Sequence, residues 1–230
     1  MSSDPLEENQ KRQTQFIAAA SHELRTPLAV ILSCASASRY GNEEERAHFL
    51  DSIQSEGTRM SGLIEDMLLL TNMKSHSWTI EKRRTELDTL LLETFEAFEP
   101  VAAEKSIRLF IDLPDRSLPA CSCDPERIRQ VLSILIHNGI SYTPSHGQIR
   151  LSLTFDGKAY RIQVTDNGIG IPDAEKAHIF NRFYRADQAR SQKGHFGLGL
   201  SIASEIIKAH QGKILVGDTP GGGSTFTIVL

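Results

Sequence analysis

The sequence predicts an α+β fold in which a helical hairpin precedes a mixed domain of helices and strands. Residues 7–40 and 43–74 carry apolar residues at helical spacing, and only a short turn separates these two segments. Beyond residue 79 the apolar residues alternate as in strands. The 230 residues are enough for one large domain or two small ones with a buried core.

The composition argues against several functional classes. The net charge is −4 and the pI about 6.1, so no basic excess points to nucleic acid. No apolar run reaches the roughly 18 residues that a membrane helix needs, and the first residues are polar and charged, unlike a signal peptide. Cys34, Cys121 and Cys123 have neither zinc spacing nor an even count, so we expect structural cysteines in a reducing cytoplasm.

The two predicted helices are expected to form an antiparallel hairpin, because the connection at Tyr40-Gly41-Asn42 is short. One hairpin cannot bury an apolar stripe on each of its helices. A second copy is therefore expected to complete a four-helix bundle, which makes the protein a homodimer. The stripe of the second helix consists of Phe49, Ile53, Met60, Leu63, Ile64, Met67, Leu70 and Met73.

A domain boundary is predicted at residues 75–79, which divides the chain into residues 1–76 and 77–230. Asp124 is a good helix N-cap with Pro125 in the first turn, and Asp156-Gly157 is a hairpin turn. The predicted helices of the second part span 86–104, 124–140 and 196–210. The predicted strands span 79–84, 106–113, 147–155, 158–165, 213–217 and 224–230.

His22 lies in the run Ser-His-Glu-Leu-Arg-Thr-Pro-Leu on the first predicted helix. A lone histidine on a helix is more often structural or merely exposed. Here Glu23 follows directly and can hold one ring N–H, which leaves the other nitrogen free as a nucleophile. Pro27 predicts a bend near His22, and Thr26, one turn away, is placed to position a water against a phosphoryl group.

Glycines gather at three places. The cluster at residues 221–223 leads into the last predicted strand, and the other two suit a nucleotide. Gly168 and Gly170 follow Asp166 at the end of a predicted strand; this is either a tight turn or a carboxylate at the floor of a pocket, and the strand context favours the pocket. Residues 197–199, Gly-Leu-Gly, open a predicted helix, where free backbone N–H groups bind phosphates. The sequence contains neither a P-loop nor a Rossmann glycine pattern.

Asn138, near the end of the helix that starts after Asp124, offers a neutral amide oxygen. Mg²⁺ binds through a few protein oxygens together with waters and phosphates, so one amide ligand is enough. A helix C-cap is the plain alternative for this residue.

Together these motifs resemble the sensor histidine kinases over nearly the whole chain. SHELRTPL is similar to the phospho-acceptor box, IHNGISYTP to the N-box, DNGIGIP to the first glycine box and residues 179–187 to the aromatic box. GHFGLGLSIA resembles the second glycine box and GGGSTFTIVL the final strand motif. The resemblance implies a dimeric helical-hairpin domain followed by an α/β sandwich of the type shared with gyrase and Hsp90.

The resemblance also implies an ATP-dependent protein-histidine autokinase that uses Mg²⁺. The phosphoryl group would pass from His22 to an aspartate of a response-regulator receiver domain. Glu23 would accept the proton of His22, and Thr26 would matter in dephosphorylating the partner.

The nucleotide-site roles are likewise implied by the resemblance. Asp166 would bond the adenine amino group, Tyr142 would lie against the ring, and Asn138 would hold Mg²⁺. Phosphate contacts would come from Arg185 and from the backbone of Gly197, Leu198 and Gly199. Gly168 and Gly170 would let the nucleotide approach, and Thr225 would support the adenine end through water.

The chain departs from the family pattern at three positions. Ile134 replaces a usual asparagine, Ser141 a frequent lysine, and His195 a common glycine. We expect these changes to weaken ATP binding without abolishing it. Two other functions stay open: a degenerate nucleotide-binding scaffold that acts mainly as a phosphatase, and an ATPase of the gyrase–Hsp90 type.

The resemblance also bears on where the chain works. It implies no direct membrane contact for this segment. We expect a cytoplasmic location, either as the cytoplasmic portion of a membrane-anchored sensor or as a soluble kinase.

Overall fold

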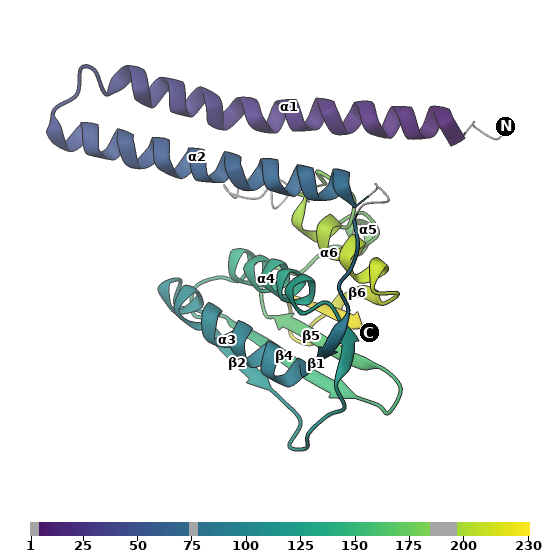
Figure 1. Cartoon of the computed structure of the whole chain (residues 1–230). Helices are drawn as coiled ribbons and strands as arrows, with labels where there is room; N and C mark the ends of the chain where they lie inside the picture. Colours follow the sequence, from purple (N-terminus) through teal and green to yellow (C-terminus); the bar gives the residue numbers. More distant parts are fainter. Residues whose placement is uncertain (1–4, 74–77, 185–196) are drawn as a thin grey trace.

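The computed structural model describes residues 5–73, 78–184 and 197–230, and within them all side chains except those of residues 5–13 and 15. Helices α1 (Pro5–Ala37) and α2 (Glu43–Asn72) run antiparallel and contact each other along their length (Figure 1). The predicted hairpin is therefore confirmed. The predicted domain boundary falls partly on residues 74–77, outside the described residues, and stays a prediction.

The turn between the two helices is fixed by a capping box at the start of α2. The Asn42 side chain accepts a hydrogen bond from the Glu45 backbone N–H at 2.9 Å, and the Glu45 carboxylate accepts one from the Asn42 N–H at 2.8 Å. Glu43 and Glu44 add negative charge in the first turn, which the helix dipole favours. The short connection and its cap hold α2 back against α1.

The hairpin leaves much apolar surface uncovered, as expected of half a bundle. Leu63 and Leu70 are buried, whereas other large apolar side chains on the same two helices remain in water. The exposed ones are Ile17, Leu28, Val30, Leu32, Leu50, Ile64 and Leu68. This pattern fits the expected dimer. None of the described helices is long and apolar enough to cross a membrane.

The second part of the chain is a helix-covered sheet. Its five strands lie in the order β2-β4-β5-β7-β6, with β2 parallel to β4 and the other neighbours antiparallel. The strands are β2 (Arg108–Asp112), β4 (Gln148–Phe155), β5 (Tyr160–Asp166), β6 (Lys213–Asp218) and β7 (Ser224–Val229). The helices that contact this sheet are α3 (Leu87–Glu104), α4 (Pro125–Tyr142) and α6 (Gly199–Ala209).

The sheet has one buried face and one more exposed face, because successive side chains of a strand point to opposite sides. Ile149, Leu151 and Leu153 of β4 are buried, whereas the residues between them are exposed or half-buried. The same alternation in β5 and β7 puts Asp166 and Ser224 on the buried, helix-covered face. The α/β sandwich expected from the resemblance is confirmed, and the candidate site lies at the helix side of its central strands.

The structure differs from the sequence-based prediction in several short elements. Strand β1 is only Arg83–Thr85, shorter than the predicted 79–84, and pairs with an unpredicted strand β3 (Cys121–Cys123). A four-residue helix α5 (Asp173–Lys176) was also not predicted. Helix α1 continues through Pro27 as one element, with that proline buried, so the bend near His22 stays a prediction.

Among the described residues, the hairpin contacts the second part of the chain at α6 and at Phe183. Helix α2 contacts α6, and the Phe16 ring of α1 lies 5.4 Å from the Phe183 ring, measured between centroids. The Arg182 guanidinium lies over the same Phe16 ring, 5.6 Å from its centroid. In Figure 1 the C-terminal end of α2 is accordingly the part of the hairpin nearest to α6.

Candidate functional site

Asp166 forms the floor of the site, at the end of β5. Its side chain is 6% exposed, and its Oδ1 accepts hydrogen bonds from the backbone N–H groups of Gly168 at 2.9 Å and Ser224 at 3.2 Å. Burial raises the pKa of this carboxyl, and the two N–H groups oppose that rise. Both bonds end on Oδ1, so Oδ2 is the oxygen left to accept from a ligand.

Glycines let three chain segments meet around this carboxylate. A Cβ added to Gly168 would stand 2.4 Å from the Tyr142 carbonyl oxygen, and one added to Gly223 would stand 2.0 Å from that of Asp166. Gly170 has a φ of +71° and lies against Gly223. The Ile169 N–H also donates to the Tyr142 carbonyl at 3.2 Å. The structure thus brings Tyr142, Asp166, Gly168 and Gly170 together.

One face of α4 connects this floor to the start of α6. Ile134, Asn138 and Tyr142 are spaced by four residues and so follow one another along the helix. Tyr142 touches the Asp166 loop, and the Ile134 side chain lies 3.2 Å from the Cβ position of Gly199. The eight residues between these ends rise about 12 Å. Asn138 therefore lies midway between the Asp166 loop and the N-terminus of α6.

Residues 197–199 open α6 as predicted. Leu198 is buried and occupies the N-cap position, and its carbonyl accepts from the Ile202 N–H and the Ser201 hydroxyl. Gly197 has a φ of +71°, and its carbonyl accepts from the Phe183 N–H at 2.9 Å. The first N–H groups of an α-helix have no partner inside the helix, which makes this end attractive to phosphate.

The structure shows how one departure from the family pattern, Ile134 in place of asparagine, is accommodated. Its side chain fills the space under Gly199 with apolar contact where an asparagine would offer polar groups. The start of α6 is thereby supported by packing. Arg185 and His195, by contrast, lie outside the described residues.

Thr225 lies on β7, opposite Thr165 of β5 in the strand register. Its hydroxyl is within hydrogen-bond distance of the Thr165 hydroxyl at 3.2 Å and the Thr219 hydroxyl at 3.0 Å. It is adjacent to Ser224, whose N–H reaches Asp166. Thr225 is therefore near the floor, held in a row of hydroxyl groups.

His22, Glu23 and Thr26 lie on α1, away from these contacts. His22 and Thr26 are exposed and Glu23 is half-buried. Among the described residues, no hydrogen bond or ion pair joins this trio to the residues around Asp166. One link between the two regions is the Phe16–Phe183 contact, because Phe16 precedes His22 on α1 and the Phe183 N–H donates to the Gly197 carbonyl.

The donor set around Asn138 fits Mg²⁺ held together with phosphates. Among the described residues no three His, Cys, Asp or Glu side chains form a cluster that could hold a metal by themselves. A single amide oxygen between a buried carboxylate and a helix N-terminus is enough protein ligand for a Mg²⁺ ion, since this ion keeps several waters.

Two residues of the floor were not predicted. Gly223 and Ser224 close over Asp166, and the Ser224 bond joins positions 58 residues apart. The signal was present in the Gly-Gly-Gly-Ser-Thr run before the last strand. By itself the run predicts a turn leading into a strand, and no residue near it in the sequence indicates that it meets the Asp166 loop.

Two sequence families match the chain in the predicted order. Residues 12–76 match the His Kinase A (phospho-acceptor) domain, and residues 123–230 match the histidine kinase-, DNA gyrase B- and HSP90-like ATPase family.

The similar curated relatives and solved structures are also histidine kinases. The chain is 34% identical to the sensor histidine kinase WalK of Bacillus subtilis, across 97% of the chain and 37% of WalK. It is 36% identical to the sensor histidine kinase RppB of a Synechocystis strain, across 98% of the chain and 50% of RppB. The chain thus spans between about a third and a half of these relatives.

Among solved structures, histidine kinase ThkA in complex with the response regulator protein TrrA aligns with a TM-score of 0.78 at 25% identity. That alignment covers 98% of this chain and 65% of ThkA. The Acinetobacter baumannii histidine kinase AdeS aligns with a TM-score of 0.71 at 25% identity, covering 91% of this chain and 96% of AdeS.

Proposed function

Because the chain belongs to the sensor histidine kinases by both of its matched domains, we propose that it is an ATP-dependent autokinase that phosphorylates His22. The observation that carries the proposal is the combination of two sites in one chain. An exposed histidine in His-Glu-Leu-Arg-Thr-Pro stands on a helical hairpin, and a buried carboxylate with one oxygen left to accept stands on the α/β domain. We likewise propose that the chain divides into two domains, residues 1–76 and residues 77–230.

The proposed nucleotide position runs from Asp166 along α4 to the start of α6. Asp166 accepts the adenine amino group through Oδ2, Tyr142 lies against the ring, and Thr225 supports this end through water. Gly168 and Gly170 allow the close approach. The triphosphate then follows the α4 face past Asn138 to the N–H groups of residues 197–199, and Arg185 joins it there.

Phosphoryl transfer in this scheme depends mainly on positioning and charge. A neutral ring nitrogen of His22 forms a bond to the γ-phosphorus while the bond from that phosphorus to the β–γ bridging oxygen breaks, and ADP leaves. Glu23 accepts the proton that the imidazole gives up. Asn138 holds Mg²⁺, which neutralises charge on the phosphate oxygens when it is bound.

The partners follow from the same family membership. The phosphoryl group passes from His22 to an aspartate of a response-regulator receiver domain, and Thr26 positions water when the chain acts as a phosphatase. A second copy covers the exposed apolar side chains of α1 and α2 and makes a homodimer. We place this chain in the cytoplasm, where ATP and receiver domains are found.

Incubation of the full chain with γ-labelled ATP and Mg²⁺ tests the proposal against its rivals. We expect protein-bound label that is acid-labile and base-stable, that is lost in His22→Gln and that persists in the matched exposed-histidine control His48→Gln. Binding of ATP without label would indicate a degenerate scaffold. Steady ATP hydrolysis without label would indicate a gyrase-type ATPase.

A further inference from the structure

Two buried cysteines stand on the strand that anchors the connection between the two parts of the chain. Cys121 and Cys123 are the ends of β3, and two-residue spacing in a strand puts their side chains on one face. Cys121 is 8% exposed and Cys123 0%. Strand β3 pairs antiparallel with β1, which leads out of the hairpin, with Thr85 opposite Cys121 and Arg83 opposite Cys123.

The two thiols lie on the same face of β3, and each shifts the pKa of the other. A hydrogen bond from the Cys121 thiol lowers the pKa of Cys123, and the Thr85 hydroxyl adds to this effect. The same bond between the thiols raises the pKa of Cys121. Cys123 is therefore the more acidic thiol of the pair, and Cys121 lies beside it as the less acidic one.

We propose that Cys121 and Cys123 are a redox site that hydrogen peroxide converts to an intramolecular disulfide, and that this loosens β1 from β3. The thiolate of the pair attacks one peroxide oxygen, the O–O bond breaks and hydroxide leaves, which gives a sulfenic acid. The second sulfur then attacks the sulfenic sulfur, the S–O bond breaks and water leaves. Two electrons from the two sulfurs reduce one peroxide to two waters.

The strand must contract for this bond to form. Residues two apart in an extended strand have Cα atoms roughly 6.6–6.8 Å apart, at the upper limit of the range that disulfides span. A disulfide is therefore expected to draw β3 out of its extended form. In the part of the chain that the structure describes, β1 and β3 form a two-stranded sheet of three residue pairs, without a further strand to absorb the change.

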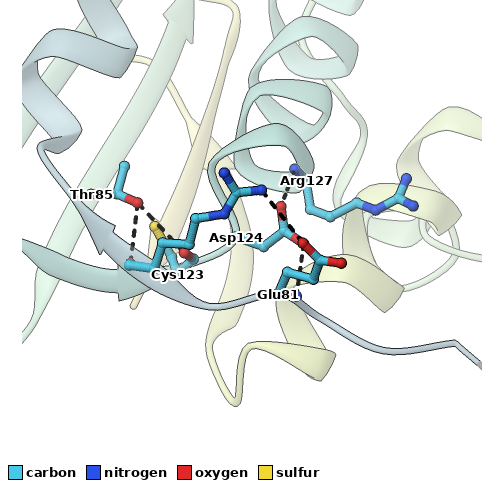
Figure 2. Close-up of polar contacts among 6 residues, drawn as sticks. Glu81, Thr85, Cys123, Asp124 and Arg127 are labelled. Atoms are coloured by element: carbon cyan, nitrogen blue, oxygen red, sulfur yellow. Dashed lines mark hydrogen bonds and ion pairs between the residues drawn. The ribbon is translucent and has the colours of Figure 1, made fainter.

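Contacts around Asp124 extend the effect from β3 to the connection and to α4 (Figure 2). The Cys123 carbonyl accepts from the Thr85 hydroxyl at 3.5 Å, and the next residue, Asp124, accepts from the Glu81 N–H at 3.1 Å and from the Arg127 N–H at 3.2 Å. The Asp124 N–H donates to Nε2 of the buried His210 at 3.0 Å. Distortion at Cys123 thus reaches the connecting chain, the first turn of α4 and the end of α6.

The consequence for activity rests on the proposed function, whereas the disulfide itself does not. A looser β1 gives the hairpin a less fixed orientation on the α/β domain, and the rate of His22 phosphorylation should change on oxidation. Formation of the bond and release of β1 are both measurable without ATP, so their failure is distinguishable from failure of the kinase proposal.

The first test uses the full chain carrying Cys34→Ser, so that only the pair can react. After treatment with hydrogen peroxide and alkylation, mass spectrometry of the tryptic peptide of residues 117–127, which contains both cysteines, should show loss of two hydrogen atoms. Dithiothreitol should reverse it. Free alkylated thiols, or oxygen added to either sulfur in place of the disulfide, would overturn the proposal. In the wild type, pairing of either residue with Cys34 would do the same.

The second test asks whether β1 is released. Trypsin cleavage after Arg83 and Arg84 needs the strand to leave its partner, so oxidation should raise its rate about tenfold and dithiothreitol should restore it. Cleavage after Arg59 on α2 is the internal control and should not change. Cys121→Ser should make cleavage at β1 insensitive to peroxide. An unchanged rate in the oxidised Cys34→Ser chain would show that the disulfide does not act on β1.

Discussion

The phospho-acceptor region and the nucleotide region of this chain are built in opposite ways. His22, Glu23 and Thr26 come from one turn of one helix, and His22 and Thr26 are exposed there. The floor around Asp166 is assembled from the end of α4, the end of β5 and the start of β7, with backbone in contact at Gly168 and Gly223. Substitutions should therefore act locally on the first region and through the fold on the second.

The largest effect is expected at Gly223, where the backbone approach is closest. In Gly223→Ala a Cβ would stand 2.0 Å from the Asp166 carbonyl oxygen. We expect a loss of about 3 kcal/mol of unfolding free energy and no measurable ATP binding, because the floor must shift.

Gly222→Ala is the matched control for that variant. Gly222 has a φ of +115°, similar to the +101° of Gly223, but nothing lies within 4 Å of its Cβ position. It should show only the backbone strain, about 1 kcal/mol. Urea unfolding and calorimetry with ATP measure both quantities, and equal losses in the two variants would refute the packing argument.

Asp166→Asn should separate binding from stability. The amide oxygen can still accept the hydrogen bonds from the Gly168 and Ser224 N–H groups. The amide NH₂ then replaces Oδ2, and because it is a donor it cannot accept a hydrogen bond from the adenine amino group. ATP affinity should fall about 30-fold, equivalent to about 2 kcal/mol, and preference for ATP over GTP should shrink.

The same variant should not lose stability. Burial raises the pKa of Asp166 above its ordinary value, so the ionised form costs folded-state stability at neutral pH. The unfolding free energy of Asp166→Asn should then stay equal or rise slightly. Asp115→Asn, in an exposed loop, is the control for both measurements. Undiminished ATP affinity would contradict the assigned role.

Much of this contrast could be predicted from the sequence, for physical reasons. The acceptor motif is contiguous, and the hairpin, the Asp124 cap and the Asp156-Gly157 turn each depend on residues within a few positions. Strand β3 was missed because three residues show no alternation, and the Ser224–Asp166 bond because it joins distant segments. The parallel pairing of β2 with β4 was likewise set by tertiary packing.

The hairpin itself contains one group that its environment strongly perturbs. Burial, followed by the nearby Glu65 charge, raises the pKa of Asp66 on α2 from 3.8 to about 6. A carboxyl whose pKa is higher in the folded state binds protons more tightly there. The ionisation of Asp66 therefore lowers the free energy of unfolding as pH rises from about 4 to about 6. Above about pH 6 this loss of stability stays constant.

Asp66→Asn should remove this cost. We expect a gain of about 1–2 kcal/mol in unfolding free energy at pH 7 and little change at pH 4, discounted for partial solvent screening. Glu65→Gln, which removes only the neighbouring charge, should gain less. Urea unfolding at both pH values measures this, and a larger gain at pH 4 would reverse the sign of the argument.

The smallest structural effect is expected at the acceptor. His22 is exposed on α1, so His22→Gln should change the unfolding free energy by less than about 0.5 kcal/mol. ATP affinity should stay within about twofold of wild type. Calorimetry checks both, and a large loss of ATP binding would mean that the acceptor and nucleotide regions are not independent.

The position of the phosphoryl group after incubation with ATP and Mg²⁺ tests the central claim most directly. Tandem mass spectrometry, under conditions that preserve phosphohistidine, should be applied to the tryptic peptide of residues 13–25, which contains both Ser21 and His22. The account predicts phosphate on the His22 imidazole. Phosphate on Ser21, or accumulation of ADP while the peptide stays unmodified, would contradict it.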